Sequence, residues 1–323
     1  MPAGKRPPLV IAHRGASGYL PEHTLAAKAL AFGLGADFLE QDVVATGDDC
    51  LVVLHDIHLD RVTDVAERFP SRHREDGRFY ARDFDLAELR TLNVHERRHA
   101  DGSAVFPGRF PTRLGRFGIT TLAEEIEMIR GLAQSTGRVA GIYPEIKAPA
   151  WHREEGADLS RLVLRELERQ GFAESGDPVY LQCFDAFELR RIREELGSDL
   201  KLVQLIAASG SRGTEADFDQ LATADGLRQV AAYADAIGPA LEDLYGFADI
   251  DGHAVSSGLV SAAHAAGLLV HPYTFRADAL PPGFAGFGEL VEWFAVTLGI
   301  DGLFTDFPDL AALALRRPGD AAS

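Results

Sequence analysis

Two acidic residues lie two positions apart in the apolar segment FLEQDVV, at residues 38–44. Alternate side chains of a strand point to the same face, so Glu40 and Asp42 face the same way, with Cα atoms about 6.6 Å apart. Two carboxylates that share a cavity repel each other unless a proton or a cation lies between them. The segment YPEIK (143–147) repeats the pattern with Glu145 and Lys147. Three acids that offer only oxygen atoms favour a hard cation, Ca²⁺ or Mg²⁺, over zinc.

Two histidines directly follow apolar segments. His13 ends LVIAH (9–13) and is followed by Arg14, and His55 comes near the end of LVVLHD (51–56). Imidazole titrates near neutral pH, so one histidine can accept a proton while another donates one. Arg14 and Lys147 add fixed positive charge that suits a phosphate group. Together with the three acids, these residues predict metal-assisted phosphoryl transfer with His13 and His55 as the acid and base.

The fold must bring these side chains close together. Between most of the apolar segments lie stretches of helical period, such as LSRLVLRELERQG (159–171) and AFELRRIREELG (186–197). Alternating strands and helices predict an α/β fold, a parallel (β/α)₈ barrel of the TIM type, in which residues after the strands line the ligand site. The candidate strands are residues 9–13, 38–44, 51–56, 140–147, 179–184, 201–206, 234–238, 268–275 and 302–306.

The list holds one strand more than such a barrel needs. Residues 45–50 are too few for a parallel crossover, so segments 38–44 and 51–56 form either a hairpin-like excursion or an irregular part of the barrel. Residues 57–139 lack a β/α rhythm and are rich in charge, Gly and Pro. We interpret them as an insertion between the third and fourth strand regions that flanks the barrel mouth, with short helices near 85–93 and 122–134. Residues 1–323 are expected to form a single domain that includes this insertion.

Composition narrows the class of function. The chain has 323 residues, 46% of them hydrophobic, and a formal net charge of −17, which disfavours binding to nucleic acid and to anionic membranes. No apolar run approaches the roughly 20 residues that span a bilayer, so we expect no membrane insertion. Cys50 and Cys183 are the only cysteines and are interpreted as buried free thiols. The start shows no cleavable signal peptide, which implies a cytoplasmic protein, or a periplasmic or secreted one if an export signal was removed.

Seven segments in series resemble the signature blocks of the glycerophosphodiester phosphodiesterase family, most closely its bacterial periplasmic-type branch. They run from residue 13 to 309 and are HRGASGYLPEHT, FLEQDVV, VVLHD, YPEIKAP, LQCFD, HPYT and LFTDFPD. The resemblance implies a TIM-type barrel and a Ca²⁺-dependent hydrolase. Such an enzyme cuts glycerophosphodiesters such as glycerophosphocholine and glycerophosphoethanolamine into sn-glycerol 3-phosphate and an alcohol.

Matching positions transfer the family's roles onto this sequence. The resemblance makes Glu40, Asp42 and Glu145 metal ligands, His13 and His55 the acid/base pair, and Arg14 and Lys147 phosphate contacts. It leaves two routes open: attack by the substrate's own glycerol hydroxyl through a cyclic phosphate, or direct attack by a metal-bound hydroxide. Candidates for the glycerol side of the pocket are Gln182, Phe184 and Tyr273, each equally compatible with a structural role. Where the wider family has Asn, this chain has His23, as in the periplasmic branch.

Two other functions remain as alternatives. One is a phospholipase of the same fold acting on intact phospholipids, and the other is a protein that binds phosphodiesters without cleaving them. The segment HERRH (95–99) also fits the zinc-protease pattern H-E-x-x-H. It is charged throughout and runs directly into Ala-Asp-Gly, so we interpret it as a chance match in a solvated loop. Oligomeric state and the preferred alcohol are not predicted.

Overall fold

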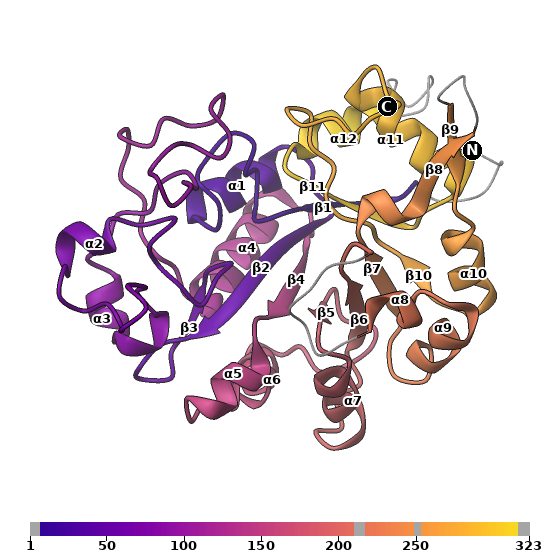
Figure 1. The fold of residues 1–323 in the computed structure, drawn as a ribbon. Coiled ribbons are helices and arrows are strands. Elements are labelled where there is room, and N and C mark those ends of the chain that lie inside the picture. The colour runs from indigo at the N-terminus through magenta and orange to yellow at the C-terminus, as the bar shows by residue number, and fades with distance from the viewer. Residues whose placement is uncertain (1–6, 210–216, 249–252, 316–323) are drawn as a thin grey trace.

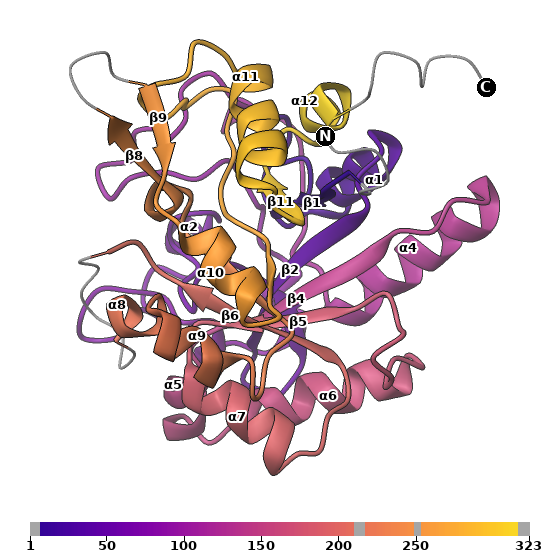
Figure 2. The same cartoon turned by 90° about the vertical axis from the view of Figure 1, so that its right-hand side faces the viewer.

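The computed structural model describes residues 7–209, 217–248 and 253–315. Its main sheet consists of parallel strands with helices on the outside, as Figure 1 and Figure 2 show from two directions. The parallel strands are β1 (Leu9–Ala12), β2 (Phe38–Ala45), β4 (Gly141–Ile146), β5 (Tyr180–Cys183), β6 (Lys201–Ile206), β7 (Ala236–Pro239), β10 (Leu269–Val270) and β11 (Gly302–Thr305). They lie side by side in the order β10-β7-β6-β5-β4-β2-β1-β11.

The two ends of this sheet meet just after β10. The amide of Phe275 donates to the carbonyl of Phe304 (2.8 Å), and the amide of Phe304 donates to the carbonyl of Pro272 (3.0 Å). The segment that follows β10 therefore joins β11, and the ring is nearly closed. The predicted (β/α)₈ barrel is confirmed.

Helices of the described chain cover the outside of the barrel, and several begin at side chains that the sequence supplies as caps. Thr24 accepts a hydrogen bond from the amide of Ala27, and Thr121 forms a capping box with Glu124. These helices are α1 (Leu25–Gly33), α4 (Leu122–Thr136), α5 (Pro149–Glu154), α6 (Leu159–Arg169), α7 (Ala186–Glu194), α8 (Phe218–Leu221), α9 (Ala224–Val230), α10 (Leu259–Ala265), α11 (Phe287–Glu292), which continues as a π-helical turn (Trp293–Leu298), and α12 (Pro308–Leu315). None of the helices in these described ranges is long and apolar enough to cross a membrane.

The extra candidate strand has an antiparallel partner. β3 (Leu51–Val53) pairs with the end of β2, with Val43 opposite Val53, so the two form a hairpin and not a crossover. A second antiparallel pair, β8 (Tyr245–Ala248) and β9 (His253–Ser256), follows a 3₁₀ turn at Leu241–Leu244 and was not predicted. Cys50 is half-buried, Cys183 is buried, and both are free.

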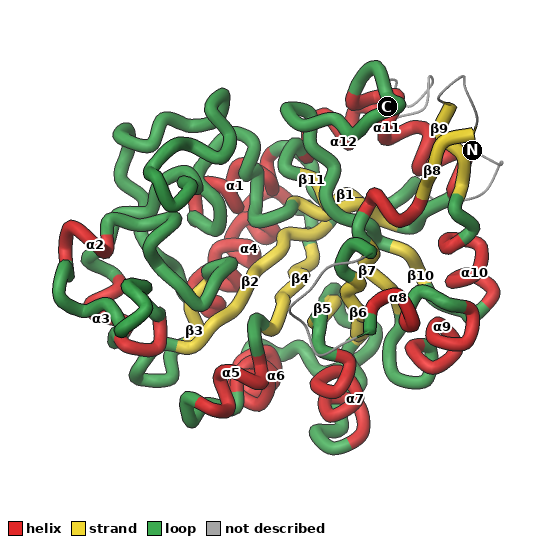
Figure 3. Tube along the Cα trace, viewed as in Figure 1, coloured by secondary structure: helices red, strands yellow, loops and turns green. Residues whose placement is uncertain are grey.

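Much of the predicted insertion forms a separate layer beside the barrel. We call residues 57–121 the side lobe; it lies on the left of Figure 1 and is mostly loop in Figure 3. Its short helices are α2 (Val65–Arg68), a 3₁₀ turn (Ala81–Asp83) and α3 (Leu86–Leu89). Its own apolar cluster, which includes Leu59, Phe84 and Leu89, packs against Val44 of β2 and Val52 of β3. The rest of the predicted insertion includes α4, which packs against α1 as a barrel helix. The single-domain assignment stays a prediction.

Candidate active site

A cavity of about 210 Å³ lies at the carboxyl ends of the barrel strands. Every predicted site residue lines it, although the residues come from segments far apart in the sequence. Residues that were not predicted, among them Glu242 and Arg276, also line it. The predicted residues brought together here are His13, Arg14, Glu40, Asp42, His55, Glu145, Lys147, Gln182, Phe184 and Tyr273.

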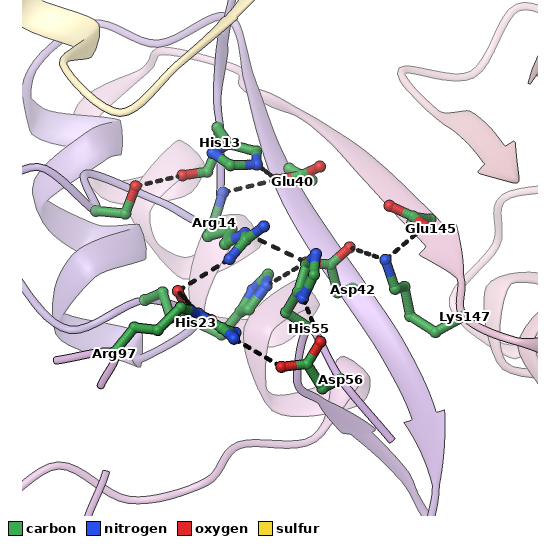
Figure 4. Close-up of polar contacts among 12 residues, drawn as sticks. His13, Arg14, His23, Glu40, Asp42, His55, Asp56, Arg97, Glu145 and Lys147 are labelled. Carbon is green, nitrogen blue, oxygen red and sulfur yellow. Dashed lines mark hydrogen bonds and ion pairs between the residues drawn. The ribbon is translucent and has the colours of Figure 1, made fainter. Parts of the chain in front are cut away.

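The three carboxylates meet because of strand register. Asp42 of β2 is opposite Glu145 of β4, and Glu145 is opposite Gln182 of β5. Glu40 lies two residues before Asp42 and therefore shares its face. One oxygen atom from each of the three acids lies within 4.8 Å of the other two, and all three residues are buried. Figure 4 shows them facing a common space between β2 and β4.

The three acids lie close together and are buried. Burial and the neighbouring charge of Asp42 raise the pKa of Glu40 well above its usual value. Burial raises the pKa of Glu145 to about 8, against the opposing effect of Lys147. Burial would also raise the pKa of Asp42, but Lys147 and His23 hold it well below its usual value. The three acids therefore do not all ionise at neutral pH unless a cation lies among them.

These residues fit a hard divalent cation. Oδ1 of Asp42 is buried without a hydrogen-bond donor anywhere in the described part of the chain, and its nearest cation, Nζ of Lys147, is 3.8 Å away. Buried polar atoms normally have a partner, so an unpaired carboxylate oxygen inside an acidic cluster is a candidate ligand atom. The oxygen-only donor set matches Ca²⁺ or Mg²⁺. Glu40, Asp42 and Glu145 would hold it.

A tight turn after β1 presents Arg14 to the cavity. Arg14 has φ of 60° and Gly15 has φ of 90°. A Cβ atom on Gly15 would lie 2.8 Å from the backbone of Ala27, so only glycine fits this turn. The backbone amide of Arg14 donates to Oε2 of Glu40 (2.7 Å), and its guanidinium donates to Glu22 (3.0 Å).

Each of the two predicted catalytic histidines is paired with an aspartate through Nδ1. Nδ1 of His13 lies 2.6 Å from Oδ1 of Asp306, and Nδ1 of His55 lies 2.7 Å from Oδ1 of Asp56. Burial and the charge of Arg14 lower the pKa of each histidine to about 4. Both imidazoles are therefore neutral at pH 7. An ionised carboxylate only accepts hydrogen bonds, so Nδ1 of each histidine carries the proton and Nε2 is unprotonated.

Comparisons with known proteins identify the family of the chain. The family model described as "Glycerophosphoryl diester phosphodiesterase family" matches residues 13–310. The chain belongs to this family. A glycerophosphodiester phosphodiesterase from Haemophilus influenzae is 44% identical over 95% of this chain and 90% of its own length. Another from Treponema pallidum is 38% identical over 96% of this chain and 92% of its own.

A solved structure shares the fold. The structure of an Oleispira antarctica phosphodiesterase in complex with the product sn-glycerol-3-phosphate has a TM-score of 0.64 and 24% sequence identity. The match covers 96% of this chain and 97% of that one. These relationships identify the chain as a phosphoric diester hydrolase with glycerophosphodiester phosphodiesterase activity. They favour an enzyme over the alternative of a protein that only binds phosphodiesters.

The structure places several polar residues at the site to which the sequence analysis assigned no role there. His23, noted in the sequence only as a departure from the wider family, contacts Asp42, and Asp306, in the block LFTDFPD, contacts His13. Arg97 and Arg109 of the side lobe reach the same region, and no local pattern in that loop singles them out. Asp56 and Asp306, the partners of the two histidines, are visible in the sequence as acids at the ends of the apolar segments LVVLHD and LFTD, which is the one available signal.

The zinc-like motif in the side lobe does not form a site. Residues 95–99 are not helical, so His95 and His99 do not share a helix face. Nδ1 of His95 is used to donate to the carbonyl of Glu96 (2.8 Å). Among the described residues, the acids Glu40, Asp42 and Glu145 form the one group with metal-site spacing. The interpretation of the motif as a chance match agrees with this geometry, but the loop is not solvated throughout, because His95 and Glu96 are buried.

Proposed function

We propose that this phosphodiesterase hydrolyses small, soluble glycerophosphodiesters, such as glycerophosphocholine and glycerophosphoethanolamine, to sn-glycerol 3-phosphate and an alcohol. In this proposal Glu40, Asp42 and Glu145 hold one divalent cation, with Ca²⁺ preferred to Mg²⁺, and His13 and His55 act as acid and base. The observation that carries it is the meeting of three buried carboxylates and two aspartate-paired histidines around one cavity.

The cation, when bound, would neutralise the acidic cluster and stabilise negative charge that develops on the phosphate. Carboxylate clusters with room for further oxygen ligands suit Ca²⁺, which accepts six to eight ligands in flexible geometry. Mg²⁺ requires a stricter octahedral arrangement, and nothing in the cluster imposes one. This supports Ca²⁺ as the first metal to test.

The chain's own residues supply binding and proton transfer. Arg14 and Lys147 present fixed positive charges to the phosphate, and both side chains are largely buried, so water screens them weakly. Phe184 and Tyr273 pack edge to face at 6.0 Å and offer an apolar wall to the glycerol carbons, beside Gln182. The unprotonated Nε2 of one histidine would take the proton of the attacking hydroxyl. The other histidine would first take a proton from solvent and then give it to the leaving alcohol, and the base would return its proton to solvent. Both routes of attack, by the glycerol hydroxyl or by water, fit this arrangement.

A substrate the size of a glycerophosphodiester suits the small, polar cavity better than an intact phospholipid does. The product bound in the Oleispira antarctica relative, sn-glycerol-3-phosphate, is the smaller half of such a substrate. The net charge of −17 also opposes docking on anionic lipid surfaces. A phospholipase of this fold is the alternative that the experiment must distinguish from a hydrolase of soluble glycerophosphodiesters.

The test compares hydrolysis of glycerophosphocholine, glycerophosphoethanolamine and phosphatidylcholine vesicles. Release of glycerol 3-phosphate measures cleavage of the two soluble substrates. Release of choline or phosphocholine measures cleavage of the vesicles, because an intact phospholipid keeps its acyl chains and yields no glycerol 3-phosphate. We expect turnover of the two soluble substrates, its loss with chelator, and its recovery with Ca²⁺. His13→Ala and His55→Ala should each lower kcat by about 100-fold or more. His99→Ala, an exposed histidine of the side lobe, is the matched control and should leave activity unchanged. Preference for vesicles, recovery with Zn²⁺ alone, or full activity of either histidine variant would contradict the proposal.

A further inference from the structure

The side lobe reaches both histidines of the site through their aspartates. Oδ1 of Asp56 contacts His55, and Oδ2 of Asp56 accepts a hydrogen bond from Nη1 of Arg97 (2.6 Å). Figure 4 shows this chain of contacts from Arg97 to His55. Arg97 belongs to the side lobe, whereas His55 and Asp56 directly precede it. Arg97 therefore binds one oxygen of the Asp56 carboxylate, and the other oxygen of the same carboxylate binds His55.

The second histidine has the same arrangement. Oδ1 of Asp306 contacts His13, and Oδ2 of Asp306 accepts hydrogen bonds from Nη2 of Arg109 (2.6 Å) and Nε of Arg276 (2.8 Å). Arg109 is again a side-lobe residue, and it lies 197 positions from Asp306 in the chain. Its side chain is 4% exposed, and its guanidinium stacks 3.6 Å from the centre of the Phe106 ring.

Both arginines have further partners that fix their planes. Arg97 binds the two oxygens of Glu22 (2.6 and 3.1 Å), and Glu22 in turn binds Arg14. Arg109 binds both oxygens of Asp278 (2.8 and 3.1 Å). Guanidinium groups held at several donors are rigid, so the carboxylates that they bind are held in one orientation. A loose carboxylate would let the imidazole rotate or change tautomer.

We propose that the side lobe is a positioning element of the active site, in which Arg97 through Asp56 and Arg109 through Asp306 hold His55 and His13 with Nδ1 protonated and Nε2 facing the cavity. The inference rests on the proposed function, because it assumes that the two histidines exchange protons with the substrate. Arg97 and Arg109 are positioning residues and need not touch the substrate. The side lobe is therefore required for turnover more than for binding.

The first test compares the kinetics of glycerophosphocholine hydrolysis in Arg97→Met, Arg109→Met and their lysine counterparts. We expect each methionine variant to lower kcat by about tenfold or more and to leave KM within about twofold. Lysine keeps one positive charge, so each lysine variant should recover part of kcat. An equal loss in the lysine and methionine variants, or a rise in KM with kcat unchanged, would overturn the inference.

Arg74→Met is the matched control. Arg74 also belongs to the side lobe and also joins it to the barrel, through Glu155 (2.7 Å), but it contacts neither aspartate. It should retain kcat and KM, with any change confined to the thermal midpoint. If Arg74→Met lost kcat as the other two variants do, the side lobe would act only through general stability, and the inference would fail.

A second readout is independent of activity. Two-bond ¹H–¹⁵N spectra distinguish the Nδ1–H and Nε2–H tautomers of histidine, and His13→Gln and His55→Gln identify the two signals. We expect Nδ1–H for both in the wild type, with a tautomer mixture at His55 in Arg97→Met and at His13 in Arg109→Met. An inactive wild type with these spectra would overturn the proposed function and support the positioning role. Spectra that the arginine variants leave unchanged would overturn the positioning role itself.

Discussion

Nε2 of His23 lies 2.6 Å from Oδ2 of Asp42, and the two side chains are only 2% and 1% exposed. Burial lowers the pKa of His23 to about 3, so the imidazole is neutral, and it donates to an ionised Asp42. His23 therefore fixes one oxygen of Asp42 and leaves Oδ1 for another partner.

This contact predicts the effect of His23→Ala on the cation requirement. Without its donor, Asp42 is free to rotate, so the Ca²⁺ concentration for half-maximal activity should rise by about tenfold, with a smaller change in kcat at saturating Ca²⁺. The measurement is a Ca²⁺ titration of glycerophosphocholine hydrolysis. His23→Asn, which restores the residue of the wider family, should lie closer to the wild type. An unchanged Ca²⁺ midpoint in His23→Ala would contradict the prediction.

Cation binding should also be visible in thermal stability. A ligand that binds only the folded state stabilises it by mass action, so a 100-fold excess of Ca²⁺ over its dissociation constant should raise Tm by about 4 °C. Calorimetry with Ca²⁺ or with chelator measures this shift. Glu145→Gln removes one of the three candidate ligands and should lose most of the gain. An equal gain in wild type and variant would place the cation elsewhere.

A buried ion pair joins α1 to α4. Nζ of Lys28 lies 3.0 Å from Oε2 of Glu125, and both side chains are 0% exposed. Removing one partner leaves the other charge buried without compensation, so Lys28→Met should lower the free energy of unfolding by about 3 kcal/mol. Replacing both, as Lys28→Met with Glu125→Leu, should recover most of the loss.

Urea unfolding followed by circular dichroism measures these differences. The control is the pair of Glu166 and Arg169, whose arginine is exposed, and Arg169→Met should change stability by less than about 1 kcal/mol. Both variants lose the hydrogen bond that Nζ of Lys28 donates to the backbone carbonyl of Glu40, so it cancels when they are compared. A double variant less stable than Lys28→Met alone would contradict the prediction. Neither side chain is part of the cavity lining.

The centre of the site could be predicted because its chemistry is local in the sequence. Period-two spacing sets Glu40 and Asp42 on one face, and strand ends in a parallel barrel converge at one mouth. His13 and Glu145 are therefore predictable from segments of five to seven residues. Strand boundaries were less accurate: 268–275 was expected as one strand, but β10 covers only Leu269–Val270, because the chain then turns to meet β11.

The surroundings of the site could not be predicted because long loops have no period. Arg97 stands inside HERRH, where it resembles part of a solvated charge run, yet its side chain is 11% exposed and contacts Asp56. Only tertiary contacts distinguish it from neighbouring arginines of the same loop. The same holds for Arg109, whose partner Asp306 is at the other end of the chain.

The last prediction concerns His271 in the barrel interior. It is 0% exposed, and Nδ1 lies 2.8 Å from the hydroxyl of Tyr143. Burial lowers its pKa from 6.5 to about 4. The unfolded chain therefore binds a proton at this residue between pH 6.5 and 4 that the folded chain does not. The stability that neutral His271 provides is complete above pH 6.5 and is lost as the pH falls through this window.

His271→Gln removes this titration. Between pH 7.5 and 5 the wild type should lose about 2 kcal/mol more unfolding free energy than the variant does, whatever the variant's stability at pH 7.5. Urea unfolding at a series of pH values measures both slopes. The other histidines, such as His13 and His55, titrate in both proteins and cancel in the difference. Parallel slopes would mean that His271 is protonated equally in the folded and unfolded chain, which its apolar surroundings oppose.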